Sequence, residues 1–366
     1  MYIYEQKEWP KFTWDNEKIL TKLTEVKLSQ GLLLGKMQTL GFNLREEATL
    51  NALTDDVLKS SEIEGEIFDK EQVRSSIARR LGIDIGGEIP VDRHVEGTVE
   101  MMLDATQRYN EPLTKERLIG WHAALFPTGY SGMYKITIGQ FRDDKKGPMQ
   151  VVSGRIGREK VHYQAPPAHK LEEEMNAFLK WVHDENDIDP VIKAGLGHLW
   201  FVTLHPFDDG NGRIARALAD MLLARAEQSN QRFYSMSAQI RRERNTYYTI
   251  LEKTQKGSLN ITEWLLWFLD CLQRAIQQSD ETLGNILKKA LFWQKNADLT
   301  LNERQKKIIN RLFDGFEGKL TSSKWAKIGK CSQDSANRDI LDLIEKNVLI
   351  KQGAGRSTHY ILNTDE

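Results

Sequence analysis

The sequence predicts a mainly α-helical protein that carries two short β-hairpins. Apolar residues recur at intervals of three and four along most of the 366 residues, and this spacing marks one face of an α-helix. Short β-prone runs around a glycine-containing turn occur in only two places, at residues 150–167 and 348–362. The second hairpin follows two helical segments, so the chain is expected to end in the order helix, turn, helix, hairpin.

The helical segments can be placed in chain order from their apolar spacing. Two long helices are expected first, at residues 16–37 and 46–63. The segment LGIDIGGEIP, residues 81–90, is rich in glycine and ends in proline, so it predicts a connection. Further helices are expected at residues 92–109, 114–125, 168–183, 191–204, 212–228, 242–254 and 261–290.

The end of the chain matches the plan of a winged helix-turn-helix. Helices are expected at residues 321–328 and 332–346, followed by the hairpin at 348–362. We therefore expect three domains: an N-terminal helical domain (1–90), a helical core (91–290) and a small winged helix-turn-helix domain (291–366).

Composition excludes several classes of protein. The 51 basic and 52 acidic residues nearly cancel, so the chain does not bind polyanions through bulk charge. Its two cysteines, Cys271 and Cys331, lie far apart and form no CxxC pattern, which excludes a disulfide framework and a zinc site of that type. The N-terminal residues lack the pattern of a signal peptide, and the most apolar run, residues 264–269, is too short to span a membrane. These features predict a cytoplasmic protein with no membrane partner.

One stretch, HPFDDGNGRIAR at residues 205–216, concentrates groups that bind anions. It should form a loop that leads from one helix into the N-terminus of the next. Gly210 and Gly212 allow the backbone amides around them to converge on one point, which creates an anion-binding nest at a helix start. Arg213 and Arg216 lie three residues apart on that helix and can add two cationic groups. The stretch therefore predicts a phosphate site.

The same stretch also offers a metal ligand and a base. Mg²⁺ in proteins is commonly held by one or two carboxylates together with phosphate oxygens, and Asp209 or Asp208 could supply this contact. His205 is the side chain best suited to accept a proton near neutral pH. The combination is typical of phosphoryl or nucleotidyl transfer. The alternative is an ordinary turn in which His205 is a core residue, Asp208 caps the helix and the arginines face solvent.

This stretch resembles the signature of Fic-domain proteins, HPFx(D/E)GNGRxxR, at every defined position. The resemblance implies a mostly helical core with a β-hairpin flap and transfer of AMP from ATP to a Ser, Thr or Tyr hydroxyl of a target protein. It implies a catalytic set of His205 as the base, Asn211 and Arg213, with Asp209 as the Mg²⁺ ligand. The residues that would bind ATP through this motif are Gly210, Asn211, Gly212, Arg213 and Arg216, with Arg216 on the γ-phosphate. The sequence contains no proper P-loop, since GFEGKLTS at Gly315 has the wrong spacing.

The resemblance extends to the hairpin at residues 150–167 and to a tyrosine pair. The hairpin matches the family's flap, which would pair a target segment as an added strand. The flap residues expected to face the target are Val151, Val152, Ser153, Gly154, Arg155 and Ile156. Tyr247 and Tyr248 resemble a family pair near the adenine of ATP, although Gln255 stands where an asparagine is expected. Taken without the resemblance, these two tyrosines are typical of core packing.

Upstream, KSSEIEGE at residues 59–66 resembles a second family pattern, (S/T)xxxE(G/N), through Ser60, Glu64 and Gly65. Ser60 and Glu64 are four residues apart and share a helical face, and Gly65 suits a helix end. The resemblance implies that Glu64 pairs with Arg216 and inhibits the site, because the carboxylate occupies the guanidinium that the γ-phosphate needs. The same glutamate leaves an alternative open, in which it aligns a water that removes AMP, so that the protein is a hydrolase or works in both directions.

The two ends of the chain indicate a further domain and possible binding partners. Residues 1–15 resemble the opening of an uncharacterised N-terminal domain that often precedes bacterial Fic cores. Residues 319–358 carry eight Lys or Arg and four Asp or Glu, a local charge of +4. This excess suits duplex DNA, with the helix at 332–346 as the recognition helix near Asn337 and Arg338. It equally suits an ordinary solvated face, and winged-helix tails of Fic proteins also serve protein or self-association. A homodimer and self-AMPylation are further expectations from the family.

Overall fold

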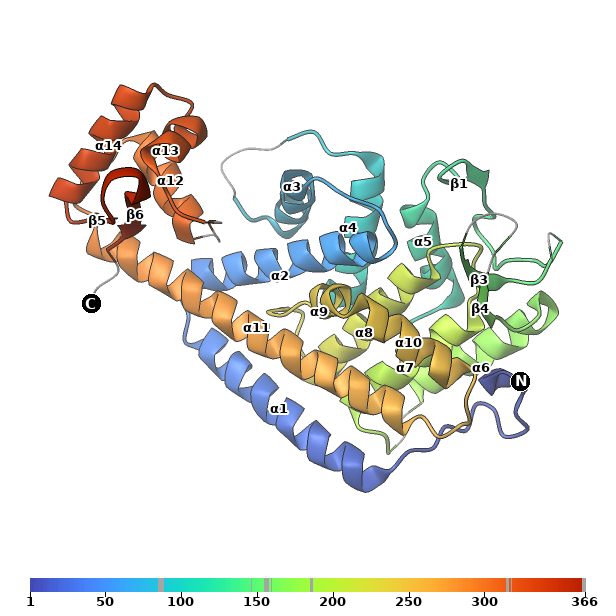
Figure 1. Cartoon of the computed structure of the whole chain (residues 1–366). Helices are drawn as coiled ribbons and strands as arrows, with labels where there is room; N and C mark the ends of the chain where they lie inside the picture. The colour runs from blue at the N-terminus through green and yellow to red at the C-terminus, as the bar shows by residue number, and fades with distance from the viewer. Residues whose placement is uncertain are drawn as a thin grey trace. The chain divides into compact units, whose positions relative to one another are not determined.

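The computed structural model of the chain describes residues 1–84, 89–145, 147–154, 158, 160–184, 187–313, 316 and 318–363. These residues form two compact units, Met1–Ser279 and Asp280–Glu366. The first is built of helices around a central pair, α7 (Pro190–Leu204) and α8 (Asn211–Glu227) (Figure 1). Nearly every residue of α7 is buried, because its sequence is apolar on all sides. The short loop between α7 and α8 is thereby held at the centre of the unit.

The N-terminal helices come first. They are α1 (Asn16–Gln38), α2 (Phe42–Ile63) and α3 (Lys70–Leu81). The Asp15 side chain accepts a hydrogen bond from the Lys18 amide and so caps α1. The start of α2 lies four residues before the predicted residue 46. The helix α3 was not predicted, since Val73 and Ile77 are its only large buried apolar residues among many charged ones.

The other helices of the first unit surround α7 and α8. They are α4 (Arg93–Gln107), α5 (Lys115–Leu125), α6 (Leu171–His183), α9 (Met236–Arg242), α10 (Arg244–Gln255) and α11 (Thr262–Lys295), which continues into the second unit. The helix predicted at 242–254 is present as α10, and the short helix α9 before it, which ends at Arg242, was not predicted. The N-cap of α9 is Ser235, whose side chain accepts from the Ala238 amide. The long helix α11 runs beside α1, where Lys22 forms an ion pair of 2.6 Å with Asp270 (Figure 1).

Two β-hairpins belong to the first unit. The strands β3 (Gln150–Ser153) and β4 (Lys160–Gln164) pair antiparallel, with an irregularity between Val151 and Val152. A smaller hairpin, β1 (Tyr130–Ser131) with β2 (Tyr134–Lys135), was not predicted, so the expectation of strands in only two places is wrong. Two residues per strand are too few to give an alternating pattern.

The second unit contains α12 (Glu303–Phe313), α13 (Ser322–Gly329) and α14 (Gln333–Glu345), then β5 (Leu349–Gln352) and β6 (His359–Leu362). The two strands pair antiparallel around a turn at Gly353 and Gly355, both of which have positive φ. Its core includes the fully buried Trp325 and Ile308. The order helix, turn, helix, hairpin is present, and α12 precedes it without having been predicted.

The boundary expected near residue 90 does not separate two compact units. The helix α2 packs against α9 and α4, so residues 1–84 belong to the same unit as the helices that follow. The second unit begins at Asp280, ten residues before the end expected for the core. Part of the 81–90 connection, at residues 85–88, lies outside the described residues. None of the described helices is long and apolar enough to cross a membrane.

Candidate active site

The loop between α7 and α8 is shaped by two residues in the left-handed backbone region. His205 ends α7 with φ 50° and ψ 57°, and its amide donates to the Phe201 carbonyl oxygen at 3.1 Å. A non-glycine residue in this conformation is uncommon and strained. Gly210 precedes α8 with φ 79°, and a Cβ at this position would lie 2.9 Å from the Phe126 ring. Only glycine fits there without displacing Phe126.

Asn211 holds the loop in this shape. Its side-chain oxygen accepts from the Phe207 amide at 3.0 Å, and its side-chain nitrogen donates to the Phe207 carbonyl at 2.8 Å. Phe207 is fully buried and stacks on His122 with ring centroids 4.2 Å apart. The Asn211 side chain is therefore engaged within the loop, and its backbone amide, in the first turn of α8, is the group left for an anion.

Arg142, from the segment before β3, connects this loop to the β3–β4 hairpin. Its guanidinium donates to the carbonyl oxygens of His205 at 2.7 Å and Pro166 at 2.6 Å, and to the Asp144 carboxylate at 2.8 Å. The residue is only 4% exposed. Burial is the main cause that lowers the pKa of Arg142 below its ordinary value, and Asp144 offsets part of it. The start of the loop and the end of β4 are thus fixed to one buried group.

The protonation state of His205 follows from its surroundings. Its Nδ1 lies 3.1 Å from the Val202 carbonyl oxygen, which can only accept. Nδ1 therefore carries the proton and Nε2 keeps a lone pair. Burial lowers the pKa of His205 below its ordinary value, although the Val202 carbonyl opposes the shift. The imidazole is therefore neutral near pH 7 and able to accept a proton at Nε2.

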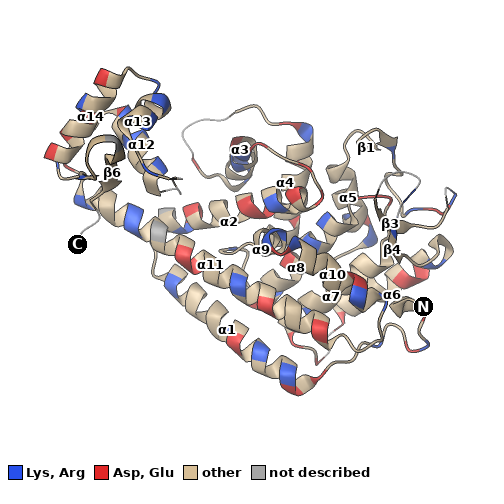
Figure 2. Cartoon of the chain, viewed as in Figure 1, with Lys and Arg blue, Asp and Glu red and all other residues tan. Residues whose placement is uncertain are grey.

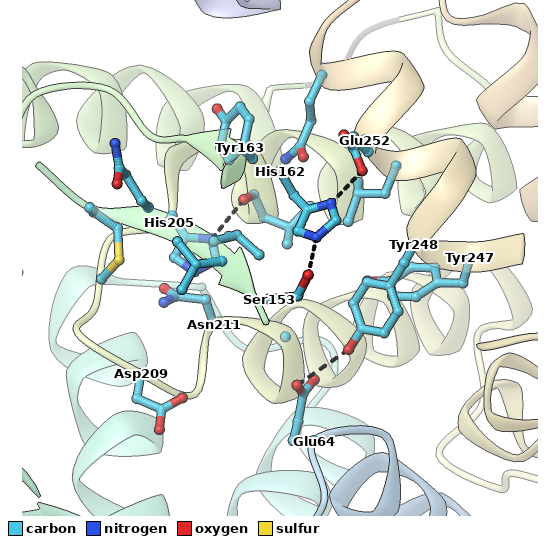
Figure 3. A pocket seen from close by; sticks show the side chains of 18 of the residues that line it. Glu64, Ser153, His162, Tyr163, His205, Asp209, Asn211, Tyr247, Tyr248 and Glu252 are labelled. Carbon is cyan, nitrogen blue, oxygen red and sulfur yellow. Dashed lines mark hydrogen bonds and ion pairs between the residues drawn. The ribbon is translucent and has the colours of Figure 1, made fainter. Parts of the chain in front are cut away.

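His205 lines a cavity of about 590 Å³, a size typical of small-molecule sites. The first residues of α8, Asn211 and Gly212, lie on its wall, where the backbone amides have no carbonyl partner within the helix. Figure 3 shows Glu64, Tyr248, Ser153 and His205 around this space. A base and a helix N-terminus thus meet at one cavity.

The two arginines of the stretch are buried on α8. Arg213 and Arg216 are each 2% exposed. Arg213 lies with its guanidinium 5.0 Å from the centre of the Phe126 ring, and its buried Nε has no hydrogen-bond partner among the described residues. Burial tends to lower the pKa of Arg216, but Glu64, Tyr247 and Tyr248 together outweigh it, so the pKa stands above its ordinary value. Both guanidinium groups are positively charged. Neither lines the cavity, but Glu64, which pairs with Arg216, does.

Glu64 pairs with Arg216 and lines the cavity. Its carboxylate accepts from Arg216 Nη2 at 2.8 Å, and Arg216 also donates to the hydroxyl of Ser60 at 2.9 Å and to its carbonyl oxygen at 2.9 Å. A Cβ on Gly212 would collide with Oε1 of Glu64. Glu64 is the residue that ends α2, with Gly65 following at φ 88°. Ser60 and Glu64 of the upstream pattern thus contact α8, and Glu64 lies against its N-terminus.

A second carboxylate was missed by the sequence reasoning. Glu66 lies 2.6 Å from Arg213 Nη1, so each arginine of the stretch is paired with a glutamate from residues 64–66. The side chain of Glu66 is 42% exposed, against 30% for Glu64. The upstream pattern ends before this position, and only the close spacing of the two glutamates could have suggested it.

The carboxylates expected to meet Mg²⁺ lie in the loop. Asp209 lines the cavity and accepts hydrogen bonds from the Ser131 hydroxyl and, at 2.6 Å, from the Gly210 amide. Asp208 also lines the cavity and accepts from the Thr137 amide at 2.9 Å, a contact typical of a structural role. Within the described ranges, no three His, Cys, Asp or Glu side chains gather into a metal cage. One carboxylate beside an anion site fits a Mg²⁺ that shares its ligands with phosphate.

The residues expected at the adenine differ in exposure. Tyr247 is 1% exposed and its hydroxyl lies 3.0 Å from Nε2 of the buried His198, so it belongs mostly to the core. The Tyr248 hydroxyl donates to Glu64 at 3.5 Å. Gln255 is buried and donates weakly to the Thr203 hydroxyl at 3.4 Å. All three line the cavity, on the side formed by α10.

The β3–β4 hairpin, which is the predicted flap, lies along the same cavity. Val151, Val152 and Ser153 of β3 line it, and Gly154 follows with φ 110°. The other two predicted flap residues, Arg155 and Ile156, lie outside the described residues. The side chain of Ser153 lies 2.6 Å from Nε2 of His162 on β4, and Nδ1 of His162 lies 2.6 Å from the Glu252 carboxylate on α10 (Figure 3). Neither His162 nor Glu252 was among the predicted site residues, because they come from separate segments and form no local motif.

Comparisons with known proteins agree with this geometry. Residues 112–223 match the Fic/DOC family, and residues 2–83 match a domain of unknown function, DUF4172. The chain is 33% identical over 143 residues to the protein adenylyltransferase Fic of Nematostella vectensis, covering 38% of this chain and 31% of that protein. It is 26% identical over 241 residues to the protein adenylyltransferase Fic of Aedes aegypti, covering 63% of this chain and 42% of that protein. The chain thus spans less than half the length of either relative.

The fold has a counterpart among solved structures. A crystal structure of a Fic family protein from Desulfovibrio desulfuricans G20 superposes with a TM-score of 0.55 at 19% identity, covering 96% of this chain and 98% of that one. At this identity the likeness concerns the fold alone.

Proposed function

We propose that this chain, which carries a Fic domain, transfers AMP from ATP to a Ser, Thr or Tyr hydroxyl of a target protein. The observation that carries the proposal is the meeting of His205 and the N-terminus of α8 at one cavity, beside the buried Arg216, which pairs with the cavity residue Glu64. A helix N-terminus with arginines binds phosphates, and a neutral imidazole beside it can accept a proton from an alcohol. The cavity lined by His205 thus holds the groups that the reaction needs.

The reaction then follows from these positions. The target hydroxyl attacks the α-phosphorus in line, a bond forms between its oxygen and phosphorus, and the bond from phosphorus to the β-phosphate oxygen breaks. Nε2 of His205 takes the hydroxyl proton, and pyrophosphate leaves. The amides at the start of α8, with Arg213 and Arg216, stabilise the negative charge that develops. Mg²⁺, when bound with ATP at Asp209, supplies further charge neutralisation on the phosphates.

In our proposal, the flap supplies the target's position. A target segment adds as a strand along β3, where Val152 is 48% exposed. Arg142 holds the end of the flap and the start of the catalytic loop together, so the position of the target hydroxyl is fixed relative to His205. Holding the two reactants in this way removes much of the entropic cost of the reaction.

We further propose that the structure described here is the inhibited form. Glu64 and Glu66 neutralise the two arginines that ATP phosphates would use, and Glu64 stands at the helix N-terminus itself. A charge-assisted contact of this kind is worth about 1.5–3 kcal/mol, and each 1.4 kcal/mol is about a factor of ten. Releasing Glu64 should therefore raise the rate by about ten to a hundredfold.

The decisive experiment uses the Glu64→Gly variant with labelled ATP, GTP, CTP or UTP in a cell lysate. Label from ATP in a discrete target protein supports the proposal, and label from none of the four opposes it. A competing function is AMP removal, in which Glu64 orients a water. Release of AMP from the modified target by the unsubstituted chain, and its loss in Glu64→Gly, would assign that reaction.

We propose a winged helix-turn-helix for the second unit, with protein or self-association as its role, including a homodimer. The helix α14, expected to be the recognition helix, carries four acidic residues, Asp334, Asp339, Asp342 and Glu345, against the single Arg338 (Figure 2). Asp339 is held by Arg304 at 3.0 Å and Asp342 by Lys346 at 2.7 Å. Such a helix suits a DNA backbone poorly. Salt-dependent binding of the full chain to duplex DNA would reverse this choice.

A further inference from the structure

Three side chains from separate elements form a continuous chain of hydrogen bonds beside the cavity. The Ser153 hydroxyl on β3 lies 2.6 Å from Nε2 of His162 on β4, and Nδ1 of His162 lies 2.6 Å from Oε2 of Glu252 on α10. All three residues line the cavity that contains His205 and the start of α8. Figure 3 shows Ser153 on the side of His162 opposite Glu252.

The donor and acceptor of each hydrogen bond follow from the ionised state of Glu252. Lys256, at 2.6 Å, and then His162 lower the pKa of Glu252 to about 2, so it is ionised near neutral pH and can only accept. Nδ1 of His162 must therefore carry a proton. In the neutral imidazole Nε2 then has a lone pair and accepts the hydrogen bond of the Ser153 hydroxyl. This order of hydroxyl, imidazole and carboxylate is the arrangement that activates a serine as a nucleophile.

Ser153 differs in this respect from the other hydroxyls around the cavity. The Tyr163 hydroxyl donates to the Thr203 carbonyl at 2.7 Å, and that of Tyr248 donates to Glu64. Tyr247 meets His198, but that histidine is buried and its described contacts include no carboxylate. Among the described residues that line the cavity, Ser153 alone joins a hydroxyl to an imidazole oriented by a carboxylate. Its side chain is also exposed, so ATP could reach it.

We propose that Ser153 is an acceptor of AMP within the chain itself, with His162 as its base and Glu252 holding His162 in position. This rests on the proposed function, since the same cavity must bind ATP. Oγ of Ser153 attacks the α-phosphorus and forms a phosphodiester, while the bond to the β-phosphate oxygen breaks and pyrophosphate leaves. The Ser153 proton passes to Nε2 of His162, and Glu252 stabilises the imidazolium.

AMP on Ser153 would also hinder the binding of a target segment to β3. Ser153 ends the strand β3 to which a target segment is proposed to add. An AMP group on its hydroxyl would introduce a bulky anion there. The self-modified chain should therefore label its target more slowly than the unmodified chain.

The test uses the full-length Glu64→Gly variant, incubated with Mg²⁺ and ATP labelled on the α-phosphate, both alone and with a lysate. Peptide mapping by mass spectrometry should find AMP on the peptide that contains Ser153. A further Ser153→Ala change should remove this label, Ser153→Thr should keep part of it, and the matched control Ser258→Ala, at an exposed serine away from the cavity, should leave it. Because general bases contribute about a hundredfold or more, His162→Gln should slow labelling of Ser153 by at least tenfold. Glu252→Gln, which keeps the shape of the side chain, should slow it in the same direction.

The outcomes separate this inference from the proposed function. Label in the target protein with none on Ser153 would overturn the inference and leave the function standing. Label in neither the target nor the chain would overturn both. Circular dichroism should first confirm that the His162→Gln and Glu252→Gln variants are folded. If they label Ser153 at an unchanged rate, His162 is not the base and Glu252 does not position it.

Discussion

Arg216 and Glu64 lie 152 residues apart in the chain and meet at 2.8 Å at the N-terminus of α8. The contact places a carboxylate where a helix start, Arg213 and Arg216 would otherwise attract an anion. An ionised carboxylate and a phosphate cannot share this position, because both are negative and both need the same donors. A substitution in this pair therefore tests the proposed inhibition directly.

Removing Glu64 should activate the chain. Glu64→Gly should raise the rate of AMP incorporation by about ten to a hundredfold, since one charge-assisted contact of about 1.5–3 kcal/mol is restored to the phosphate. Incorporation of labelled AMP into protein at fixed ATP concentration measures it. Equal rates for Glu64→Gly and the unsubstituted chain would contradict the inhibitory role.

Glu66 should contribute a smaller share. Its side chain is more exposed than that of Glu64, so solvent weakens its pair with Arg213 to about 1 kcal/mol or less. Glu66→Gln should therefore raise AMP incorporation by at most about fivefold. Glu47→Gln is a matched control, since Glu47 pairs with Arg74 at 2.8 Å on the same N-terminal helices without lining the cavity. An effect of Glu66→Gln no larger than that of this control would show that the second pair is only structural.

The pH dependence should reflect the neutral His205. Burial lowers the pKa of His205, so the imidazole stays deprotonated to a lower pH than the ordinary value of about 6.5. The pH at which the rate of AMP transfer in the Glu64→Gly variant falls to half of its plateau should therefore lie below that value. Initial rates between pH 5 and 8 at saturating ATP give the midpoint. A midpoint above 6.5 would mean that the base is not a buried histidine.

Arg142 should be the most costly residue of the site to replace. Arg142→Met keeps much of the volume but removes the donor to the His205 and Pro166 carbonyls and the ion pair with Asp144, whose carboxylate keeps the Ala168 amide as a donor. Breaking a buried charged network typically costs about 3–5 kcal/mol of unfolding free energy. Urea denaturation followed by circular dichroism measures the loss. The exposed Arg93→Met should change stability by less than about 0.5 kcal/mol, and a similar small effect at Arg142 would exclude its role as the tie between loop and flap.

The sequence predicted those parts of the molecule that depend on neighbouring residues. The spacing within residues 205–216 was enough to predict a loop that enters a helix N-terminus, and the spacing of Ser60 and Glu64 was enough to predict one face that carries both. The helix α3 escaped prediction because its buried positions are few. The Ser153, His162 and Glu252 chain and the Glu66 pair escaped because they depend on tertiary contacts over 90 and 147 residues, for which a single sequence gives no local signal.

Asn211 shows a second limit. The family motif placed Asn211 among the residues that bind ATP and did not separate its backbone amide from its side chain. In the structure both polar atoms of the side chain bond to the Phe207 backbone. A motif identifies which residues belong to a site, while the division between groups that touch the substrate and groups that shape the loop depends on the folded backbone.

The central claim is that His205 is the base in AMP transfer at this cavity, and one comparison tests it most directly. The Glu64→Gly variant and the Glu64→Gly, His205→Ala double variant are incubated with a lysate and ATP labelled on the α-phosphate, and the label on the target protein is quantified. The account predicts strong labelling by the first and a loss of at least a hundredfold in the second. Equal labelling of the target by both folded variants would contradict it.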